Sequence, residues 1–462
     1  MMRDHATPAR NPAVPAGAIA GVTCALLLAC TGQESDAPPA AAMTRPVRVF
    51  NAPVAGIEPR LLMGVLTAGD TSRLGPVGHA AFALDGGFVV ADTAALLVRG
   101  FSRLGQATFT VGSEGVGPGQ FGRIASLTVS GDTVLIFDDR LWRITAFDHD
   151  GVLISTRRVE ARPTVVPATV ARRGADGHWL HVTEQVGTTV AAEAAGSAVV
   201  RTTATLARWS APGGAWTTIA QFPGTEVYLA GDSAESPIYR SAPFARSPLW
   251  APDGQGGYWY ADSDAYSLMR VRANGDTVTH VTYGTTGPRV TEADRRDWVV
   301  DGGRLEASSP EARTRGALPV PGRRPVLLGL LASTDGEPWV AIDTGARDTI
   351  EWHALDQFGG PRRRVPLPRR ISILAVRGDS LLVAGRDANG VAFAGRFLLG
   401  AGIGSGSDRR AGPRVTMDPA AARVAPAAGH DPPSPPAAPE SGMPADGAGA
   451  VAARARRTTG GS

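Results

Sequence analysis

The strongest constraint on this chain is a spacing that recurs along it. Three times, a short apolar stretch ends in Asp, and a Gly within a polar turn follows 13 residues later. A looser fourth copy ends in Asp343, and its Gly359 comes three residues later than this spacing requires. The first two copies lie 46 residues apart, which is typical of the blades of a β-propeller. The three regular pairs are Asp92 and Gly105, Asp138 and Gly151, and Asp262 and Gly275.

The apolar stretches also indicate how the units must pack. The stretch from Val134 to Phe137 is apolar on both strand faces, as expected for a sheet that lies between two other sheets. A single unit cannot bury two apolar faces by itself. The units must therefore stack side by side and close into a ring.

Counting the units predicts an all-β, six-bladed β-propeller over residues 46–400. Seven blades fit the sequence less well, because a seventh blade would require the long third unit to be divided into two. The last unit shows only three strands, whereas a spare strand lies at Arg60–Leu66. We therefore predict that this N-terminal strand joins the last blade as its outer strand and closes the ring. The predicted blades cover residues 80–112, 125–159, 164–222, 248–283, 325–366, and 371–399 together with 60–66.

Two segments fall outside the blade pattern. Residues 291–299 have a capping-box-like start at Thr291 and Asp294, which predicts a short helix between the fourth and fifth blades. Residues 401–462 consist mainly of Ala, Gly, Pro, Ser and Arg. Such a composition buries too little apolar surface to offset the entropy of ordering, so we predict a disordered tail.

The N-terminus carries the pattern of an export signal. Arg3 and Arg10 precede an apolar run at residues 16–29 that is too short for a comfortable membrane span. The run ends in Leu-Leu-Ala-Cys at Cys30, which resembles the lipobox of bacterial lipoproteins. This resemblance implies cleavage before Cys30 and its lipidation.

The expected result is a membrane-anchored lipoprotein of the bacterial cell envelope that faces the periplasm or the cell surface. Residues 1–29 are then the signal peptide. Residues 30–45, which are polar and rich in Pro and Ala, are then a flexible tether.

A second resemblance concerns the blades. The segment Gly112–Phe121, with the sequence GSEGVGPGQF, resembles the connection between blades of NHL-type propellers. The stretches with Val/Ala-Asp endings resemble the second strand of such blades. The chain as a whole resembles bacterial NHL-like six-bladed lipoproteins, which implies a scaffold that presents loops on one face, usually without a known reaction.

Repeated Asp residues are the candidate metal ligands. Asp92, Asp138, Asp262 and Asp343 end equivalent strands, and we expect them on one face of the ring. Carboxylates that converge there would suit Ca²⁺ or another hard cation. The alternative is that each Asp caps its own turn. Repetition favours this alternative, because a structural need recurs in every blade whereas a binding site is needed once.

Arginines near these turns are the candidate ligand-binding residues. Arg99, Arg140, Arg143 and Arg270 follow the Asp turns, and guanidinium groups bind anions in a bidentate manner. The more conservative interpretation is that these arginines form solvated ion pairs with the same Asp residues.

Composition excludes several chemistries. The sequence contains no Lys, which excludes a P-loop lysine and a Schiff-base lysine. Its two Cys residues, Cys24 and Cys30, both precede the predicted blades, which leaves no thiolate zinc site there. The isoelectric point is about 9.2, but no basic stripe interleaved with aromatic residues indicates a nucleic-acid partner.

The predicted function is a lipid-anchored, non-catalytic module of the cell envelope that binds a ligand or a protein. Its expected partners are the membrane, through the anchor, and an envelope protein, peptide or glycan. The alternative is a Ca²⁺-dependent hydrolase or lyase that resembles the gluconolactonase and amidating-lyase propellers. No catalytic residue and no cofactor other than this Ca²⁺ is predicted.

Overall fold

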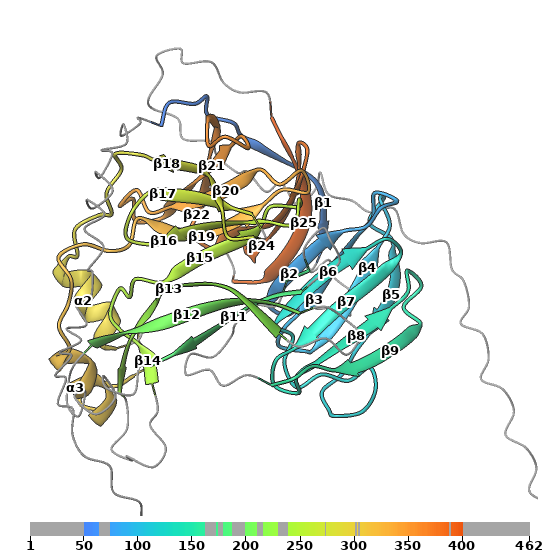
Figure 1. The fold of residues 1–462 in the computed structure, drawn as a ribbon, viewed down its shortest axis with the longest axis horizontal. Coiled ribbons are helices and arrows are strands. Elements are labelled where there is room, and N and C mark those ends of the chain that lie inside the picture. The colour runs from blue at the N-terminus through green and yellow to red at the C-terminus, as the bar shows by residue number, and fades with distance from the viewer. Residues whose placement is uncertain are drawn as a thin grey trace, which may run out of the picture. The chain divides into compact units, whose positions relative to one another are not determined.

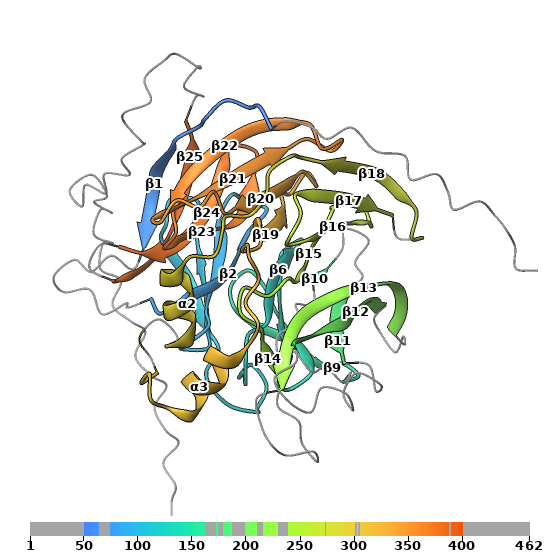
Figure 2. The same ribbon diagram turned by 90° about the vertical axis from the view of Figure 1, so that its left-hand side faces the viewer.

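The computed structural model describes residues 50–63, 74–161, 172–173, 179–186, 199–209, 216–229, 239–272, 274–300, 303, 305–387 and 390–400. Their strands form six antiparallel sheets, which are the blades of a β-propeller (Figures 1 and 2). All of these elements belong to one unit, residues 47–462. The prediction of an all-β, six-bladed propeller is confirmed.

The first three blades follow one another along the chain, and each begins with its innermost strand. Blade 1 comprises β2 (Val77–Phe82), β3 (Phe88–Asp92), β4 (Leu97–Phe101) and β5 (Ala107–Val111). Blade 2 comprises β6 (Ser126–Ser130), β7 (Thr133–Asp138), β8 (Arg143–Phe147) and β9 (Leu153–Arg158). Blade 3 comprises β10 (Arg172–Arg173), β11 (Trp179–Gln185), β12 (Val199–Trp209), β13 (Trp216–Leu229) and β14 (Tyr239–Ser241).

The last three blades continue this order, and the sixth borrows its outer strand from the N-terminal side. Blade 4 comprises β15 (Pro248–Pro252), β16 (Tyr258–Asp262), β17 (Ser267–Val271) and β18 (Thr277–Thr282). Blade 5 comprises β19 (Leu327–Ala332), β20 (Pro338–Ile342), β21 (Thr349–Leu355) and β22 (Pro361–Pro368). Blade 6 comprises β23 (Ile371–Arg377), β24 (Ser380–Arg386), β25 (Ala392–Leu399) and β1 (Ile57–Met63).

Strand direction gives the ring two distinct faces. Because neighbouring strands are antiparallel, the hairpins that join strands 1 and 2 and strands 3 and 4 lie at the same end of a blade. We call this end of the ring the hairpin face. The hairpins between strands 2 and 3 lie at the other end with the links between blades, and we call that end the connection face.

The Asp–Gly spacing has a simple structural origin. In blades 1, 2 and 4, the Asp ends the second strand on the connection face, and the Gly lies in the turn after the third strand on the hairpin face. These glycines have φ of 83°, 82° and 92°, a left-handed conformation that suits Gly. In blade 5 the turn before β21 and the strand β21 itself are both longer than in blades 1, 2 and 4, and together they explain why Gly359 comes late.

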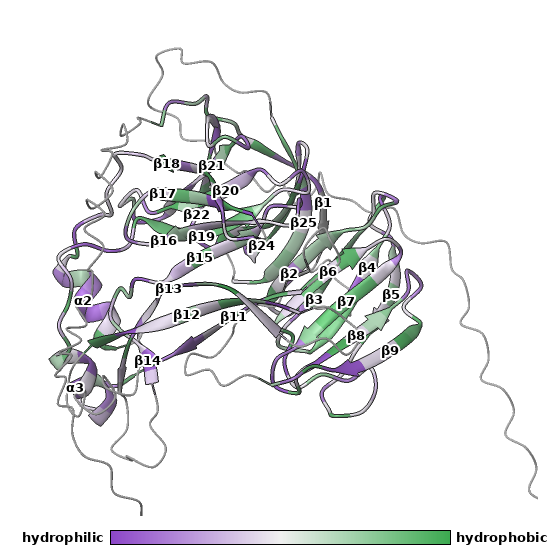
Figure 3. Ribbon diagram, viewed as in Figure 1, coloured by the Kyte–Doolittle hydropathy of each residue, from purple (hydrophilic) through white to green (hydrophobic). Residues whose placement is uncertain are grey.

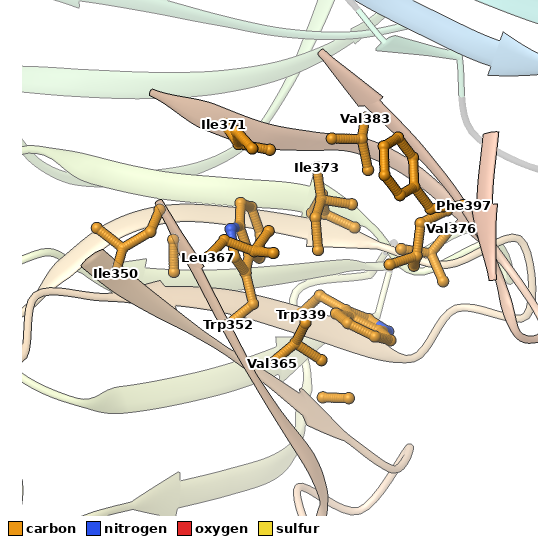
Figure 4. Packing of buried hydrophobic residues seen from close by; sticks show 14 of the residues in the cluster. Trp339, Ile350, Trp352, Val365, Leu367, Ile371, Ile373, Val376, Val383 and Phe397 are labelled. Carbon is orange, nitrogen blue, oxygen red and sulfur yellow. The ribbon is translucent and has the colours of Figure 1, made fainter. Parts of the chain in front are cut away.

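A separate cluster of buried apolar side chains fills each boundary between neighbouring blades, including the boundary between the last blade and the first. Figure 4 shows the boundary of blades 5 and 6, where Trp339 and Trp352 pack near Ile373 and Phe397. β7, the second strand of blade 2, is apolar from Val134 to Phe137, and Figure 3 shows it in green. The ring is therefore held together by contacts between sheets.

The N-terminal strand completes blade 6 as predicted. β1 pairs antiparallel with β25, with Ile57 opposite Leu399 and Met63 opposite Ala394. The predicted strand was Arg60–Leu66, whereas the observed one begins three residues earlier at Ile57. Residues 64–66 lie outside the described residues.

Residues 50–56, which we call the strap, run along the outside of blade 5 before β1 begins (Figure 2). Val54 forms a parallel bridge with Arg364 of β22, and the Ala55 amide donates to the Arg364 carbonyl at 2.8 Å. The Phe50 ring stacks on the buried His353 with 3.8 Å between ring centroids. The strap therefore covers the edge of β22 that would otherwise be open.

Blade 3 differs most from its prediction. The predicted unit ended at residue 222, whereas β13 continues to Leu229 and β14 adds a fifth strand. β13 is long and irregular, and its register shifts twice against β12. The prediction followed the regular blade length, which this unit does not keep.

The helix between blades 4 and 5 is confirmed and has a companion. α2 (Glu292–Val299) begins with a capping box in which the Thr291 side chain accepts from the Asp294 amide. α3 (Pro310–Ala317) was not predicted, although Ser309 caps its start and Pro310 occupies its first turn. The Arg240 side chain of β14 contacts Glu311 at 2.7 Å, which ties α3 to blade 3.

Several predictions fall on residues that the structure does not describe. They are the signal peptide at 1–29, the tether at 30–45 with Cys30, and the disordered tail at 401–462. Among the described residues, no helix combines the length and the hydrophobicity that crossing a membrane requires.

Candidate functional site: the central cavity

The innermost strands of the ring enclose a cavity of about 520 Å³. β2, β6, β19 and β23 line it, and blade 4 contributes Pro252 and Gly254 at the end of β15. Because every innermost strand pairs on one side only, its other edge turns unpaired N–H and C=O groups toward the cavity. The cavity is therefore rich in backbone hydrogen-bonding groups.

Among the described residues that line this cavity, none is Asp, Glu or Arg. Five of them carry hydroxyl groups, and most of the others are aliphatic or aromatic. His79 is the one titratable side chain among these described residues. A ligand that fits this lining carries neutral hydrogen-bonding groups and some apolar surface. The hydroxyl groups belong to Ser126, Thr128, Ser130, Ser333 and Thr334.

Gly329 in β19 has no side chain, so the Trp352 ring behind it reaches the cavity wall. Gly329 and Trp352 both line the cavity, although Trp352 belongs to β21, two strands further out. A Cβ atom on Gly329 would lie 3.9 Å from the tip of the Trp352 ring and 3.8 Å from the Ala341 Cβ. These distances are ordinary van der Waals contacts, so a Cβ atom at this position fits beside Trp352 without displacing its neighbours.

Arg377 fixes the edge of the cavity at the hairpin face. Its guanidinium lies 4.5 Å from the ring centroid of Phe82, a lining residue, and its Nη1 donates to the Ala83 carbonyl at 2.6 Å. Burial and the neighbouring charge of Arg396 lower the pKa of Arg377. The contact joins blade 6 to blade 1 at the mouth of the cavity.

Asp92 and Asp138 bind backbone amides on the connection face. Asp138 accepts from the Arg140 and Leu141 amides of its own turn at 3.0 and 2.9 Å, and from the Gly122 amide at 2.7 Å. Asp92 repeats this pattern with Ala94, Ala95 and Gly75. Each carboxylate therefore joins its own turn to the link that enters its blade.

Asp262 and Asp343 bind arginines from other segments. Asp262 contacts Arg201 of β12 at 2.6 Å, across the boundary of blades 3 and 4. Asp343 accepts from the Gly345 amide at 3.0 Å and also pairs with Arg324 and Arg369. None of the four predicted Asp residues belongs to the lining of the central cavity.

The four predicted arginines do not converge on one ligand site. The Arg143 guanidinium is buried, and it donates to the carbonyls of Val116 at 2.6 Å, of Gly117 at 3.0 Å and of Gln120. Arg270 pairs with Asp253 at 2.9 Å, not with Asp262.

Arg140 is exposed at the turn that Asp138 caps, and Arg99 is half-buried in β4. Neither of them lines the central cavity. Among the described residues, no group of three or more His, Cys, Asp or Glu side chains is placed to hold a metal ion.

Blade 3 contains a buried carboxylate that sequence reasoning missed. Glu184 of β11 accepts from the Thr225 amide at 2.7 Å and from the Thr202 hydroxyl at 2.5 Å. It lies one residue after Thr183, the position that aligns with the Asp of the other blades. Because Glu184 is displaced by one residue from the repeated Asp position, the spacing of the repeat did not identify it.

The chain matches no model of a known protein family, and no curated protein matches its sequence. Solved structures similar to it include a Bacteroides fragilis protein described as exported, with 11% identity and a TM-score of 0.43. This match covers 77% of the present chain and 98% of the other.

Two further similar structures have named activities. Regucalcin from Agrobacterium tumefaciens, a calcium-binding protein, has 14% identity and a TM-score of 0.36, over 76% of this chain and 98% of its own. Virginiamycin B lyase from Staphylococcus aureus has 12% identity and a TM-score of 0.34, over 72% and 87%. Similarity at this level carries no argument about the activity of the present chain.

Proposed function

We propose that this protein is a lipid-anchored β-propeller of the bacterial cell envelope that binds an uncharged ligand in its central cavity. The observation that carries the proposal is the described part of the cavity lining, which combines backbone edges, five hydroxyl side chains and apolar groups and includes no Asp, Glu or Arg. A volume of about 520 Å³ suits a small molecule or a short segment of a larger one.

The chemistry of the lining favours binding over catalysis. General acid–base catalysis requires a positioned group that gains or loses a proton, and His79 is the one titratable side chain among the described lining residues. The best-matched ligands are neutral molecules with many amide or hydroxyl groups, such as an uncharged peptide segment or a saccharide of the envelope.

The binding proposal is tested by filling the cavity. We expect Gly329→Leu to abolish binding in calorimetric titrations with uncharged peptide amides and with neutral N-acetylated oligosaccharides, because its side chain fills the space in front of Trp352. The control is Gly322→Leu, at an exposed position where a Cβ has open space. A ligand that binds wild type and Gly329→Leu equally would contradict the proposal.

The anchor is tested independently. Replacing Cys30 with Ser removes the thiol that would carry lipid, and we expect the protein to leave the membrane fraction on cell fractionation. Stable membrane anchoring rests on acyl chains at about 0.8 kcal/mol per buried CH₂. Retention of the Cys30→Ser protein in the membrane fraction would refute the lipoprotein assignment and leave the cavity proposal intact.

A further inference from the structure

Four blades close their outer hairpin with the same five-residue turn on the hairpin face. The turns begin at Ser102, Asp148, Arg272 and Asp356, directly after the third strand. In each, the amide of the fourth residue, a Gly with positive φ, donates to the carbonyl of the first. The amide of the first residue also donates to the carbonyl of the fifth. The blades can therefore be compared position by position.

The third position of this turn separates the blades into two kinds. It holds Asp150 in blade 2 and Asn274 in blade 4, residue types that turns of this kind favour before Gly. It holds Leu104 in blade 1 and Phe358 in blade 5, with exposed fractions of 72% and 67%. Since the same turn closes with Asp or Asn, its geometry does not account for the exposed apolar side chains.

Other exposed apolar side chains lie on the same face. Leu84, in the turn between β2 and β3, is 74% exposed. Val152 and Ile154, where β9 begins, are 61% and 56% exposed, and Figure 3 shows this end of β9 in green. Together with Leu104 and Phe358, these residues form what we call the apolar tips. The tips belong to blades 1, 2 and 5, and blades 2 and 5 lie opposite each other in the ring.

The strap enters the ring beside one of the tips. The Phe50 ring contacts Tyr283 with 5.2 Å between centroids, and the Tyr283 hydroxyl donates to the Gly359 carbonyl at 2.5 Å. Gly359 directly follows Phe358 in the turn of blade 5. Phe50, with which the described part of the chain begins, therefore lies near the blade 5 tip. The predicted tether with the residues up to Phe50, taken as a flexible chain of about 20 residues, would have a mean end-to-end distance of about 25 Å, short enough to hold the blade 5 tip near a lipid on Cys30.

We propose that the hairpin face lies on the lipid bilayer, with the apolar tips inserted at the boundary between headgroups and acyl chains. The inference rests on the proposed lipid anchor at Cys30. Tips on opposite sides of the ring give a flat membrane several points of contact, and the anchor holds the blade 5 side against it. The connection face, with α2 and α3, then points away from the membrane.

The cysteine content of the chain permits a direct test. The natural Cys residues are Cys24, in the predicted signal peptide, and Cys30, whose thiol would be acylated, so an introduced Cys is the one free thiol. The variants Leu104→Cys and Phe358→Cys are each labelled at the new thiol with an environment-sensitive fluorophore. The acylated, labelled proteins are then reconstituted into phosphatidylethanolamine–phosphatidylglycerol vesicles. Val116→Cys is the control, because Val116 is apolar and 78% exposed but lies in a link on the connection face.

At positions 104 and 358 we expect the fluorophore emission to shift to the blue, and lipids with spin-labelled acyl chains to quench it. At position 116 we expect neither effect. Unchanged emission at 104 and 358, or the same quenching at all three positions, would overturn the proposal. A second variant tests the cause. With Leu104→Asp and Phe358→Asn, both compatible with the turn, a probe at Ile154→Cys should lose its quenching, whereas unchanged quenching contradicts a role for the tips.

Mass spectrometry of the purified protein separates the two proposals. Absence of acyl mass on Cys30 overturns the anchor and the docking that rests on it. Acylated protein whose probes at 104 and 358 stay in water overturns the docking alone.

Discussion

The Asp residues that end the second strands show how one side chain can organise a turn and a link together. The Asp138 carboxylate accepts hydrogen bonds from two amides of its own turn and from the Gly122 amide in the link that enters its blade. A buried amide left without an acceptor costs about 1–3 kcal/mol, so this arrangement must recur wherever the same loops meet. Repetition in the sequence therefore reflects a structural requirement at Asp92 and Asp138.

Two glycines of the same turn provide a matched pair for mutation. Gly151 and Gly275 have φ of 82° and 92°, so Ala costs about 1–2 kcal/mol at either position. A Cβ on Gly151 would also lie 2.8 Å from the Cβ of Phe109, whereas one on Gly275 meets open space. We expect Gly151→Ala to reduce the free energy of unfolding by about 3 kcal/mol and Gly275→Ala by about half as much. Denaturant titration measures both, and equal losses would refute the steric part of the argument.

The sequence predicted the Asp turns well and the partners of the arginines poorly. An Asp that binds amides two and three residues ahead depends on local sequence alone. The Arg143 guanidinium instead binds carbonyls of Val116 and Gly117 in the preceding link, more than twenty positions earlier. Arg201 reaches Asp262 of the next blade. Such partners depend on how blades pack, which no local pattern contains.

The strap is an element whose stability depends on a buried histidine. His353 Nε2 lies 2.7 Å from the Glu351 carboxylate, and its Nδ1 lies 3.0 Å from the Tyr266 hydroxyl. Burial lowers the pKa of His353, although the Glu351 carboxylate partly opposes this effect. Burial would raise the pKa of Glu351, but the hydrogen bond from His353 and the charges of His353 and Arg364 outweigh it and lower that pKa. Phe50 of the strap packs directly on this neutral imidazole.

Acid should therefore weaken the contact beneath the strap. A histidine with a lowered folded pKa contributes its full stability above its unfolded pKa of 6.5, and loses it as pH falls below that value. We expect the melting temperature of wild type to fall between pH 7.5 and pH 5.5. His353→Gln should show a smaller fall over this range, because its side chain does not titrate. Equal falls in the two proteins would show that His353 does not cause the acid sensitivity.

Sequence reasoning found the regular elements and missed those that leave the repeat. The strands of blades 1, 2 and 4 were predicted to within a few residues, because each repeats a spacing. α3 was missed although Ser309 and Pro310 mark its start, since the Arg-rich segment around it has no apolar periodicity. The strap was also missed, because it uses a single backbone bridge to Arg364 and one aromatic ring at Phe50. The central cavity could not be predicted, because backbone edges from five blades form it.

On the scale of the whole molecule, β1 decides whether the ring has an open edge. β1 pairs with β25 from Ile57 to Met63. The strap that precedes β1 contacts blade 5 through the bridge between Val54 and Arg364. Without β1, blade 6 would keep three strands, and the edge of β25 would be free to pair with other chains. β1 is the outermost strand of blade 6, and it joins the N-terminal side of the chain to the last blade of the ring.

Removing residues 47–63 should therefore damage the whole ring and not one blade alone. We expect such a chain to aggregate, or to unfold at a much lower temperature than wild type in calorimetry, because the exposed β25 edge promotes association. Removal of residues 401–462 is the matched control and should leave the melting temperature unchanged. A soluble protein of unaltered stability after loss of 47–63 would show that closure by β1 is dispensable.

The pairing of β1 with β25 also has a consequence for the timing of folding. The ribosome makes β1 before every other strand of the ring and β25 after all of them, so the two partners meet only when synthesis of the domain is complete. A pairing between such distant parts of a chain forms slowly, and β1 must stay unpaired while the intervening blades are made. A chain cut short by stalled translation lacks β25 and cannot close. Ring closure is thus the step that distinguishes a complete chain from a truncated one.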